Sequence, residues 1–384
     1  MAEAELHVLL AGVSTRALAV SAALAGYRVT AVDAFGDQDL RAVADVLGSS
    51  SGTQPRFTPA GAAERARSVS ADLVAYTANF ENHPDAVTTL AQGRRLLGNP
   101  SAVLRIVRNP VRLMRALGRD GLPVPVTRGS APSSAAEARG WLLKPRRSGG
   151  GHGTVTWRPG QPVTRRYYLQ ERIAGVSGSI VFVADGRTAV PLGLSRQLVG
   201  LREFGATGFR YCGSLLASAA PVFAAQTALL SRATALASAV AQEFGLRGLN
   251  GVDFVARQGV PFPIEVNPRY AASMELVERA TGISLFALHA DSCAGRLAAA
   301  PAMPTRVYGK AIVYARQDTV VADPRMWRVA DLADIPHPGE RIGCGHPICT
   351  VLAEADSADA CVEALVRSAA AVYRGLEHSA RGAA

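Results

Sequence analysis

Asp253, Glu265 and Asn267 are three oxygen-bearing side chains that the sequence is expected to bring together. Two apolar runs, 248–254 (GLNGVDF) and 262–270 (FPIEVNPRY), flank a short polar turn, which predicts a β-hairpin with Asp253 opposite Glu265. Glu265 and Asn267 are two positions apart and therefore share a face of their strand. The alternate residues are expected to point into a core: Ile264 and Val266. Two carboxylates and an amide suit Mg²⁺, although the same face could simply point to water.

A glycine-rich turn is the second group that could do chemistry. The run RRSGGGHG (146–153) lies between the short strands expected at 141–143 and 154–157. Glycine backbone N–H groups can fold over phosphates without obstruction, and Lys144 at the base of the turn can reach the same phosphates. The chain has 39 arginines and only two lysines, so a lysine marks a place where a compact ammonium is needed. The alternative is a flexible hairpin loop, and His152 either covers the phosphates or is solvated.

A third candidate is the strand expected at 167–173 (YYLQERI), which has Gln170 and Glu171 near its end. A strand end with free backbone groups beside a carboxylate suits the edge of an adenine ring. The alternative is an edge strand with an exposed Glu171.

The elements that position these groups begin with a βαβ unit. Strands at 6–11 and 27–32 flank a helix at 15–24, which predicts a parallel sheet. The turn with Gly12 and Ser14 could hold an anion at a helix N-terminus. It lacks the GxGxxG pattern, so a dinucleotide site is weakly supported.

Polar residues follow the strands of this sheet, where open α/β sheets bind ligands. Asp33 and Asp37 follow the second strand and either touch substrate or cap their turn. Asn79, Glu81 and Asn82 lie after a strand expected at 73–77.

The remaining pattern is read as follows. Residues 52–69 look irregular, 103–117 reads as one amphipathic helix, and 175–178 reads as a loop before a strand at 179–183. A strand at 307–315 carries Lys310. The simplest interpretation of Lys310 is a strand-end residue, and the alternative is a residue of the site. A helix is expected at 357–373.

Composition narrows the class of protein. The 384 residues are 48% hydrophobic with a mean hydropathy of +0.13, enough for two or three packed domains. No apolar run is long enough to span a membrane, and the N-terminus has no signal-peptide pattern. Five scattered cysteines suggest reduced structural thiols and a cytoplasmic protein. A metal site at Cys344, His346 and Cys349 would lack a fourth ligand.

The net charge of +10 comes from dispersed arginines without a basic tail. Small anionic substrates explain this charge more simply than nucleic acid does.

The order KP…SGGGHG, QERI, GVDF and EVNPR resembles the ATP-grasp superfamily. More narrowly, ENHP (81–84), LLGN (96–99), SRQLVG (195–200) and NPRYAASMEL (267–276) resemble the predicted carboligases related to biotin carboxylase in methylotrophs and methanogens. The resemblance covers most of the chain and implies an α/β fold. It divides the chain into a Rossmann-like part (1–100), an ATP-grasp part (101–300, lid near 125–190) and a C-terminal part (301–384) that completes the catalytic domain.

The resemblance also implies roles for single residues. ATP would be bound by a lysine, the glycine loop and the adenine strand: Lys144, Ser148, Gly149, Gly150, Gly151, His152, Gly153, Gln170, Glu171, Arg172 and Ile173. Mg²⁺ or Mn²⁺ would be held by the hairpin: Asp253, Glu265 and Asn267. Arg269 and Arg196 would face the transferred phosphoryl group. Substrate would lie near the first sheet: Ser14, Asp33, Asn79 and Glu81.

Two positions depart from the family pattern. Pro110 stands where many members carry a nucleotide-contacting lysine, so Arg108 or Arg112 is expected to replace it. Gly178 stands where many members carry a ribose-binding acid.

The resemblance implies an ADP-forming ligase that activates a carboxylate as an acyl phosphate and couples it to an amine. The substrates would be a small anionic acid and an amine such as glutamate, and the narrower resemblance suggests a role in making the pterin or furan carriers of one-carbon units. The enzyme is expected to be a homodimer. The alternatives are a bicarbonate-using carboxylase and a non-catalytic nucleotide-binding protein.

Overall fold

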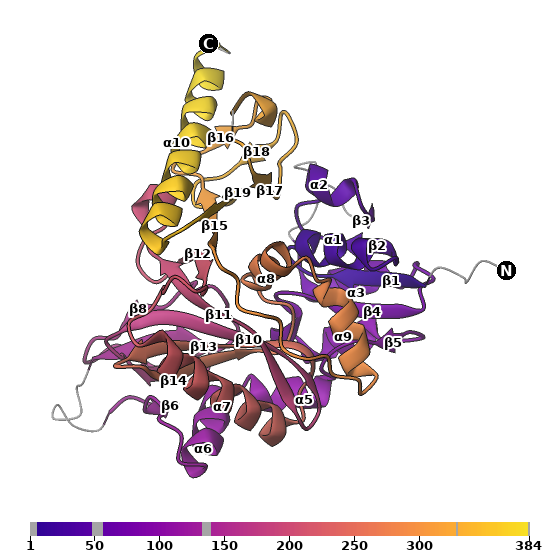
Figure 1. The fold of residues 1–384 in the computed structure, drawn as a ribbon. Helices are drawn as coiled ribbons and strands as arrows, with labels where there is room; N and C mark the ends of the chain where they lie inside the picture. Colours follow the sequence, from indigo (N-terminus) through magenta and orange to yellow (C-terminus); the bar gives the residue numbers. More distant parts are fainter. Residues whose placement is uncertain (1–5, 48–56, 133–139, 328, 383–384) are drawn as a thin grey trace.

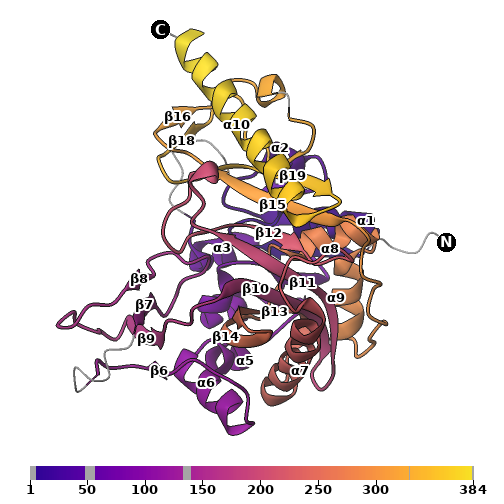
Figure 2. The same cartoon turned by 60° about the vertical axis from the view of Figure 1, so that its left-hand side comes forward.

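The computed structural model describes residues 6–47, 57–132, 140–327 and 329–382. It confirms the expected mixed α/β class: the described residues form a five-stranded parallel sheet and antiparallel sheets of eight, four and two strands. Figures 1 and 2 show these sheets and the helices that cover them. No helix in the described ranges is long and apolar enough to cross a membrane.

The first sheet is parallel and has the order β3-β2-β1-β4-β5. Its strands are β1 (His7–Ala11), β2 (Arg28–Val32), β3 (Asp45–Leu47), β4 (Leu73–Tyr76) and β5 (Arg95–Leu96). The helices around it are α1 (Arg16–Leu24), α2 (Gln38–Arg41), α3 (Pro59–Ala66), η1 (Phe80–Asn82) and α4 (Pro84–Leu90). The expected βαβ start is confirmed, because β1 and β2 pair in parallel around α1.

A small antiparallel sheet carries the glycine-rich turn and has the order β6-β9-β7-β8. Its strands are β6 (Thr127–Arg128), β7 (Trp141–Pro145), β8 (Val155–Thr156) and β9 (Tyr167–Glu171). It follows the helices α5 (Ser101–Val107) and α6 (Pro110–Arg119).

The central sheet has eight strands in the order β14-β13-β10-β11-β12-β15-β19-β17. They are β10 (Val176–Asp185), β11 (Ala189–Val199), β12 (Tyr211–Leu216), β13 (Arg247–Arg257), β14 (Val260–Asn267), β15 (Val307–Tyr314), β17 (Leu332–Ala333) and β19 (Pro347–Ala355). The last three strands come from beyond residue 300, so the end of the chain completes this sheet.

Helices and short elements surround the central sheet. They are η3 (Arg202–Phe204), α7 (Gln226–Phe244), α8 (Met274–Thr281), α9 (Leu285–Cys293), η4 (Pro324–Trp327) and α10 (Ala358–Gly382), with the small β16 (Thr319–Val320) and β18 (Arg341–Ile342) pair.

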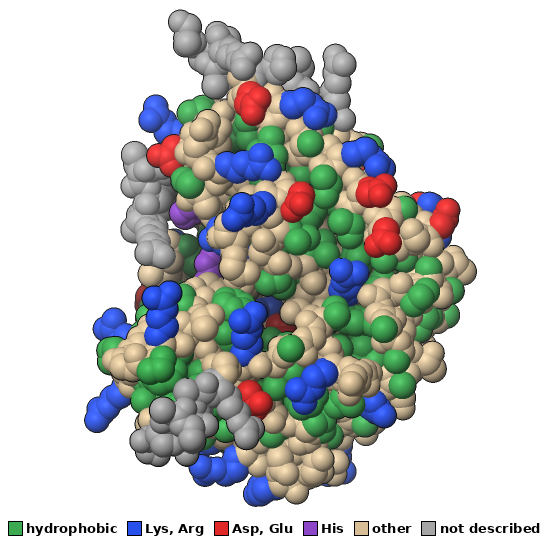
Figure 3. All heavy atoms as spheres, turned by 90° about the vertical axis from the view of Figure 1, so that its left-hand side faces the viewer, with side chains coloured by type: hydrophobic (Ala, Val, Ile, Leu, Met, Phe, Trp, Pro, Cys, Tyr) green, Lys and Arg blue, Asp and Glu red, His purple; other side chains and the backbone are tan. Residues whose placement is uncertain are grey.

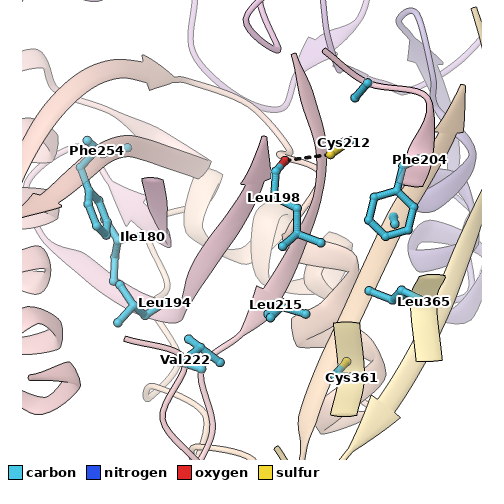
Figure 4. Packing of buried hydrophobic residues seen from close by; sticks show 14 of the residues in the cluster. Ile180, Leu194, Leu198, Phe204, Cys212, Leu215, Val222, Phe254, Cys361 and Leu365 are labelled. Carbon is cyan, nitrogen blue, oxygen red and sulfur yellow. Dashed lines mark hydrogen bonds between the residues drawn. The ribbon is translucent and has the colours of Figure 1, made fainter. Parts of the chain in front are cut away.

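One face of the central sheet packs against α7 and α10 in a large core. Figure 4 shows Ile180, Leu194 and Phe254 in this core, together with the buried thiols of Cys212 and Cys361. All five cysteines are free; Cys212, Cys349 and Cys361 are buried, whereas Cys344 is exposed.

Several expected elements are wrong. The irregular stretch 52–69 contains α3, which starts where Thr58 accepts a hydrogen bond from the Gly61 N–H at 3.1 Å; residues 52–56 lie outside the described residues. The helix expected at 103–117 is two helices, because Pro110 has no N–H to continue α5 and Asn109 caps α6.

The loop expected at 175–178 is mostly strand, since β10 already begins at Val176. The final helix runs beyond residue 373. Lys310 is not a strand-end residue but lies buried in the middle of β15, paired in register with Ser214.

Candidate functional site

The acidic hairpin forms as expected. β13 and β14 pair antiparallel with Asp253 opposite Glu265 and Gly251 opposite Asn267. The turn places Gln258 and Gly259 at positive φ, which suits a tight hairpin. Asn267 Nδ2 donates to Asp253 Oδ2 at 3.0 Å, so the three side chains meet.

One detail of the hairpin is corrected. Val266 is buried in the core as expected, but Ile264 is only half-buried and belongs to no core cluster. The pairing shifts between Asp253 and Phe254, so Ile264 becomes the extra residue of a β-bulge.

The electrostatics of the hairpin fit a bound cation. Burial and, after it, the charge of the adjacent Glu265 together raise the pKa of Asp253 to about 6. A divalent cation would relieve the repulsion between these two carboxylates. No group of three His, Cys, Asp or Glu side chains in the described ranges could hold a metal, so the Cys344–Cys349 segment forms no such site. Two carboxylates and one amide oxygen instead match Mg²⁺, which completes its shell with water and phosphate oxygens.

Lys144 is connected to this hairpin through a buried amide. Lys144 Nζ donates to Gln170 Oε1 at 3.0 Å, and Gln170 Nε2 approaches the Ile264 carbonyl oxygen at 3.3 Å. Gln170 has 0% exposure. The Gln170 amide therefore links the Lys144 ammonium to the backbone of Ile264, the residue before Glu265. Both ends of this amide are hydrogen-bonded within the protein.

Arg108 connects the glycine-rich turn to the same hairpin. Its guanidinium donates to the Ser148 carbonyl at 3.0 Å and to the Val266 carbonyl at 2.7 Å, and Nη1 lies 3.7 Å from Glu265 Oε2. Its other hydrogen bonds go to Asn82 Oδ1. Arg112 is exposed on α6, so of the two expected replacements for the lysine it is Arg108 that lies in the site.

The glycine-rich turn needs its glycines. Gly150, Gly151 and Gly153 have positive φ, and a Cβ on Gly151 would meet the Phe209 carbonyl oxygen at 1.8 Å. Ser148 Oγ donates to the His152 carbonyl at 2.6 Å, which closes the turn. The His152 ring is exposed, and burial together with Arg210 and His346 lowers its pKa.

The strand end expected to meet an adenine ring, at the end of β9, is built by backbone pairing. The N–H of Glu171 donates to the Val126 carbonyl at 2.8 Å, and the Val126 N–H donates to Glu171 Oε2 at 3.1 Å. Arg172 is exposed and its N–H donates to the Gly140 carbonyl at 2.7 Å, while Ile173 is half-buried. Glu171 thus already has one partner at this strand end.

Arg269 lies between the hairpin and the first sheet. Its Nε donates to Glu81 Oε1 at 3.0 Å and its Nη2 donates to Asn267 Oδ1 at 3.1 Å. Glu81 is only 1% exposed, and its Oε2 has no hydrogen-bond partner among the described residues. The pair fixes the arginine beside the metal-binding candidates and leaves one buried carboxylate oxygen unused.

Arg196 does not share this site. It pairs in register with Gly178, and Gly178 pairs with Phe254, so Arg196 lies on the core face of the sheet. Asp253 pairs with Ser179 and Ser179 with Ser195, on the opposite face. The expectation that Arg196 faces the phosphoryl group is therefore wrong, because its neighbour Ser195, and not Arg196, lies on the face of Asp253.

Gly178 also explains the missing ribose-binding acid. A Cβ there would lie 2.7 Å from the Phe254 ring and 2.8 Å from Phe223, inside the core. No side chain at this position of β10 could reach a nucleotide.

The other substrate candidates are occupied by local structure. Asp33 accepts hydrogen bonds from the N–H groups of Thr15, Phe35 and Gly36, which favours the capping alternative. The Ser14 carbonyl accepts from Thr77 Oγ1 at 2.9 Å, and Asn79 Oδ1 accepts from Asn82 Nδ2.

Sequence reasoning missed a buried ionic network beside the site. Glu275 forms ion pairs with both Arg16 and Lys310, and Arg16 Nε lies 3.0 Å from Asp334 Oδ1. Burial alone would raise the pKa of Glu275, but the charges of Arg16 and Lys310 outweigh burial and hold this pKa far below its usual range. Because the chain has only two lysines, the presence of a lysine at 310 could have indicated that an ammonium is needed there.

Residues 107–273 match the sequence family described as the ATP-grasp domain. An uncharacterised protein of Methanocaldococcus jannaschii is 28% identical over 115 residues, which are 30% of this chain. Those residues span 28% of that relative, so the match covers about a quarter of its length.

Solved structures share the fold over almost the whole chain. The biotin carboxylase domain of 2-oxoglutarate carboxylase from Hydrogenobacter thermophilus, solved with MgADP and bicarbonate, has a TM-score of 0.70 and 14% identity, covering 93% of this chain and 88% of that one. N5-carboxyaminoimidazole ribonucleotide synthetase from Thermus thermophilus has a TM-score of 0.67 and 19% identity, covering 97% and 98%.

Proposed function

We propose that this chain, which contains an ATP-grasp domain over residues 107–273, is an ADP-forming ligase that uses Mg-ATP to join a carboxylate to an amine. The observation that carries the proposal is the double connection between the two halves of the site. Lys144 reaches the hairpin through Gln170, and the glycine-rich turn reaches it through Arg108.

In this proposal the ATP phosphates lie between the glycine-rich turn and the hairpin. Lys144 and the backbone of residues 148–153 bind the phosphates, and Glu171, Arg172 and Ile173 form the edge that meets the adenine. Asp253, Glu265 and Asn267 would hold Mg²⁺ or Mn²⁺, which would supply positive charge that neutralises the phosphates. The biotin carboxylase domain solved with MgADP supports this assignment at the level of the fold.

The γ-phosphoryl group would pass to the substrate carboxylate and give an acyl phosphate. Arg269, fixed by Glu81, stabilises the charge that develops on the transferred group. The amine then attacks the acyl carbon and phosphate leaves. The glycine-rich turn closes over the site and keeps water from hydrolysing the acyl phosphate.

The resemblance to carboligases of methylotrophs and methanogens extends the proposal to the substrates. The acid would be a small anionic precursor, and the amine an amino acid such as glutamate, in the formation of tetrahydromethanopterin or methanofuran. Figure 3 shows basic side chains scattered singly over one face of the molecule, which fits small anions better than a polymer. A homodimer is part of the same proposal, since the biotin carboxylase domain similar to this chain was solved as a dimer.

The test is ADP release over a panel of carboxylates, amino acids and one-carbon carrier precursors. We expect turnover that requires one acid and one amine, and a loss of at least about 100-fold in Lys144→Ala and Glu265→Gln. Arg158→Ala, which removes an exposed cation of the same small sheet region, serves as the control. Turnover that needs bicarbonate and no amine would instead identify a carboxylase, and nucleotide binding without turnover a non-catalytic protein.

A further inference from the structure

Tyr211 begins strand β12 directly beside the glycine-rich turn. Its N–H donates to the Gly150 carbonyl at 3.0 Å, and its Cβ lies 3.9 Å from the position of a Cβ on Gly150. The Tyr211 carbonyl accepts from the Tyr314 hydroxyl at 2.9 Å, which fixes the backbone from the other side. The start of β12 is therefore attached to the element expected to cover phosphates.

The side chain of Tyr211 contacts a serine of the same strand. Its hydroxyl lies 2.9 Å from Ser214 Oγ. Ser214 pairs with Gln197, which lies two positions from Ser195 and therefore on the same face of the sheet. Ser195 pairs with Ser179, and Ser179 pairs with Asp253, so this is also the face of Asp253. Ser214 thus belongs to the same face as the acidic hairpin, and the phenol lies on that face too.

The charge state of the phenol fits a donor. Burial raises the pKa of Tyr211, and the negative charge of Asp253 raises it further. The phenol therefore stays protonated at neutral pH. With Ser214 as its neighbour, the hydroxyl can accept one hydrogen bond and donate its own proton elsewhere.

We propose that the Tyr211 hydroxyl donates a hydrogen bond to the γ-phosphoryl group of bound ATP, with Ser214 holding the hydroxyl in place. The assignment rests on the proposed function, because it places the γ-phosphate between the glycine-rich turn and Asp253. Tyr211 is attached to the first by its backbone, and its hydroxyl contacts Ser214 on the sheet face that also carries the second. It is a substrate-contacting residue that neither the motifs nor the charge pattern indicated.

The experiment compares two nucleotides that differ in the γ-phosphate. Isothermal titration of the full chain with Mg-ADP, and with the Mg complex of an ATP analogue carrying an imido bridge between its β- and γ-phosphates, gives the ratio of their affinities. In Tyr211→Phe we expect the analogue to bind about tenfold more weakly and Mg-ADP to bind within about twofold of wild type, since only a hydrogen bond to a charged group is lost.

Two further variants make the result decisive. Ser214→Ala should lower the same ratio by a smaller factor, and it replaces Tyr211→Phe if that variant does not fold. Tyr373→Phe removes a hydroxyl that donates to the Tyr314 carbonyl at 2.9 Å outside the site, and it should leave the ratio unchanged. An unchanged ratio in Tyr211→Phe and Ser214→Ala would overturn the inference alone, whereas a wild-type protein that binds neither nucleotide would overturn the proposed function and this inference with it.

Discussion

Lys144 is held by a neutral amide rather than by an acid. Its ammonium donates to Gln170 Oε1 at 3.0 Å, which fixes its direction without neutralising its charge. An acid at this position would compete with phosphate for the same ammonium. The choice of an amide keeps the lysine available to an anionic ligand.

Gln170→Glu tests this argument, because it changes charge with almost no change in shape. We expect Mg-ATP to bind about tenfold more weakly, since a carboxylate would pair with Lys144 and repel phosphate. The measurement is isothermal titration with the non-hydrolysable analogue. Gln161→Glu makes the same change in a turn of the small sheet region and should have no effect; equal affinity in both variants would contradict the role of Gln170.

Asp37 is a buried acid whose neighbours are acids. Burial raises its pKa to about 9, and Asp334, Asp33, Asp39 and Glu340 contribute to the same shift. Because the folded pKa is raised above the ordinary value of 3.8, this group costs stability progressively as pH rises between those values. Asp37 is the N-cap residue of α2, but its carboxylate accepts no capping hydrogen bond from the described residues of this helix.

Asp37→Asn should therefore stabilise the fold at pH 8 by about 1 kcal/mol or more, since one pKa unit corresponds to about 1.4 kcal/mol. The gain should shrink as pH falls toward the ordinary value of 3.8 and disappear below about pH 3, where the carboxyl is protonated in both states. Urea unfolding at both pH values measures the difference. A variant that is equally or less stable at pH 8 would show that the charge of Asp37 is compensated.

At the scale of elements, the acidic hairpin was predictable because strand alternation and a two-residue turn fix its register. Asp253 and Glu265 face each other as the sequence indicates. The face on which Arg196 lies was predicted wrongly. Alternation along a strand shows which residues share a face, but the pairing with a neighbouring strand decides which face points to the site. β11 pairs with β10, and the start of β10 was expected to be a loop.

Helix α5 shows a second limit of the sequence. Arg108 follows its last residue and reaches the hairpin because the chain breaks before α6 at Pro110. A continuous helix would have pointed Arg108 and Arg112 along related faces, so the choice between them could not be made from periodicity. The break is what brings one arginine into the site.

Arg108→Ala should loosen the glycine-rich turn and weaken Mg-ATP binding by about tenfold or more, because it removes hydrogen bonds to the Ser148 and Val266 carbonyls. Hydrogen exchange of residues 146–153 should also become faster. Arg112→Ala removes an exposed arginine of the same region and is the matched control. Equal exchange and affinity in the two variants would contradict the connecting role.

At the scale of the whole molecule, the two ends of the chain meet at one ionic network. The N–H of Gln38 donates to the Ile335 carbonyl at 2.8 Å, and Asp39 accepts from the N–H groups of Asp334 and Ile335 at 2.9 Å. Arg16 and Lys310 meet at Glu275 in the same region. We propose domain boundaries near residues 100 and 300, with this network joining the first part to the last. Strand and helix patterns do not indicate this network, because Arg16 and Asp39 lie more than 200 residues before Glu275, Lys310 and Asp334.

Glu275→Gln should destabilise the fold by about 3–5 kcal/mol at pH 7, because it leaves two buried cations without their shared carboxylate. The lowered pKa of Glu275 means that its contribution is present above the ordinary value of 4.5 and is lost only as pH falls well below it. The difference in urea unfolding free energy should thus be constant from pH 8 to 5. Glu354→Gln, at an exposed pair, is the control, and a similar loss there would contradict the account.

The central claim is that the glycine-rich turn with Lys144 and the acidic hairpin form one Mg-nucleotide site. The most direct measurement is isothermal titration of Mg-ATP analogue into wild type, Lys144→Ala, Glu265→Gln and the double variant. The account predicts that each single change weakens binding by at least about tenfold and that the losses are not additive, since both groups hold the same phosphates. Affinity that is unchanged when either half of the site is altered would contradict it.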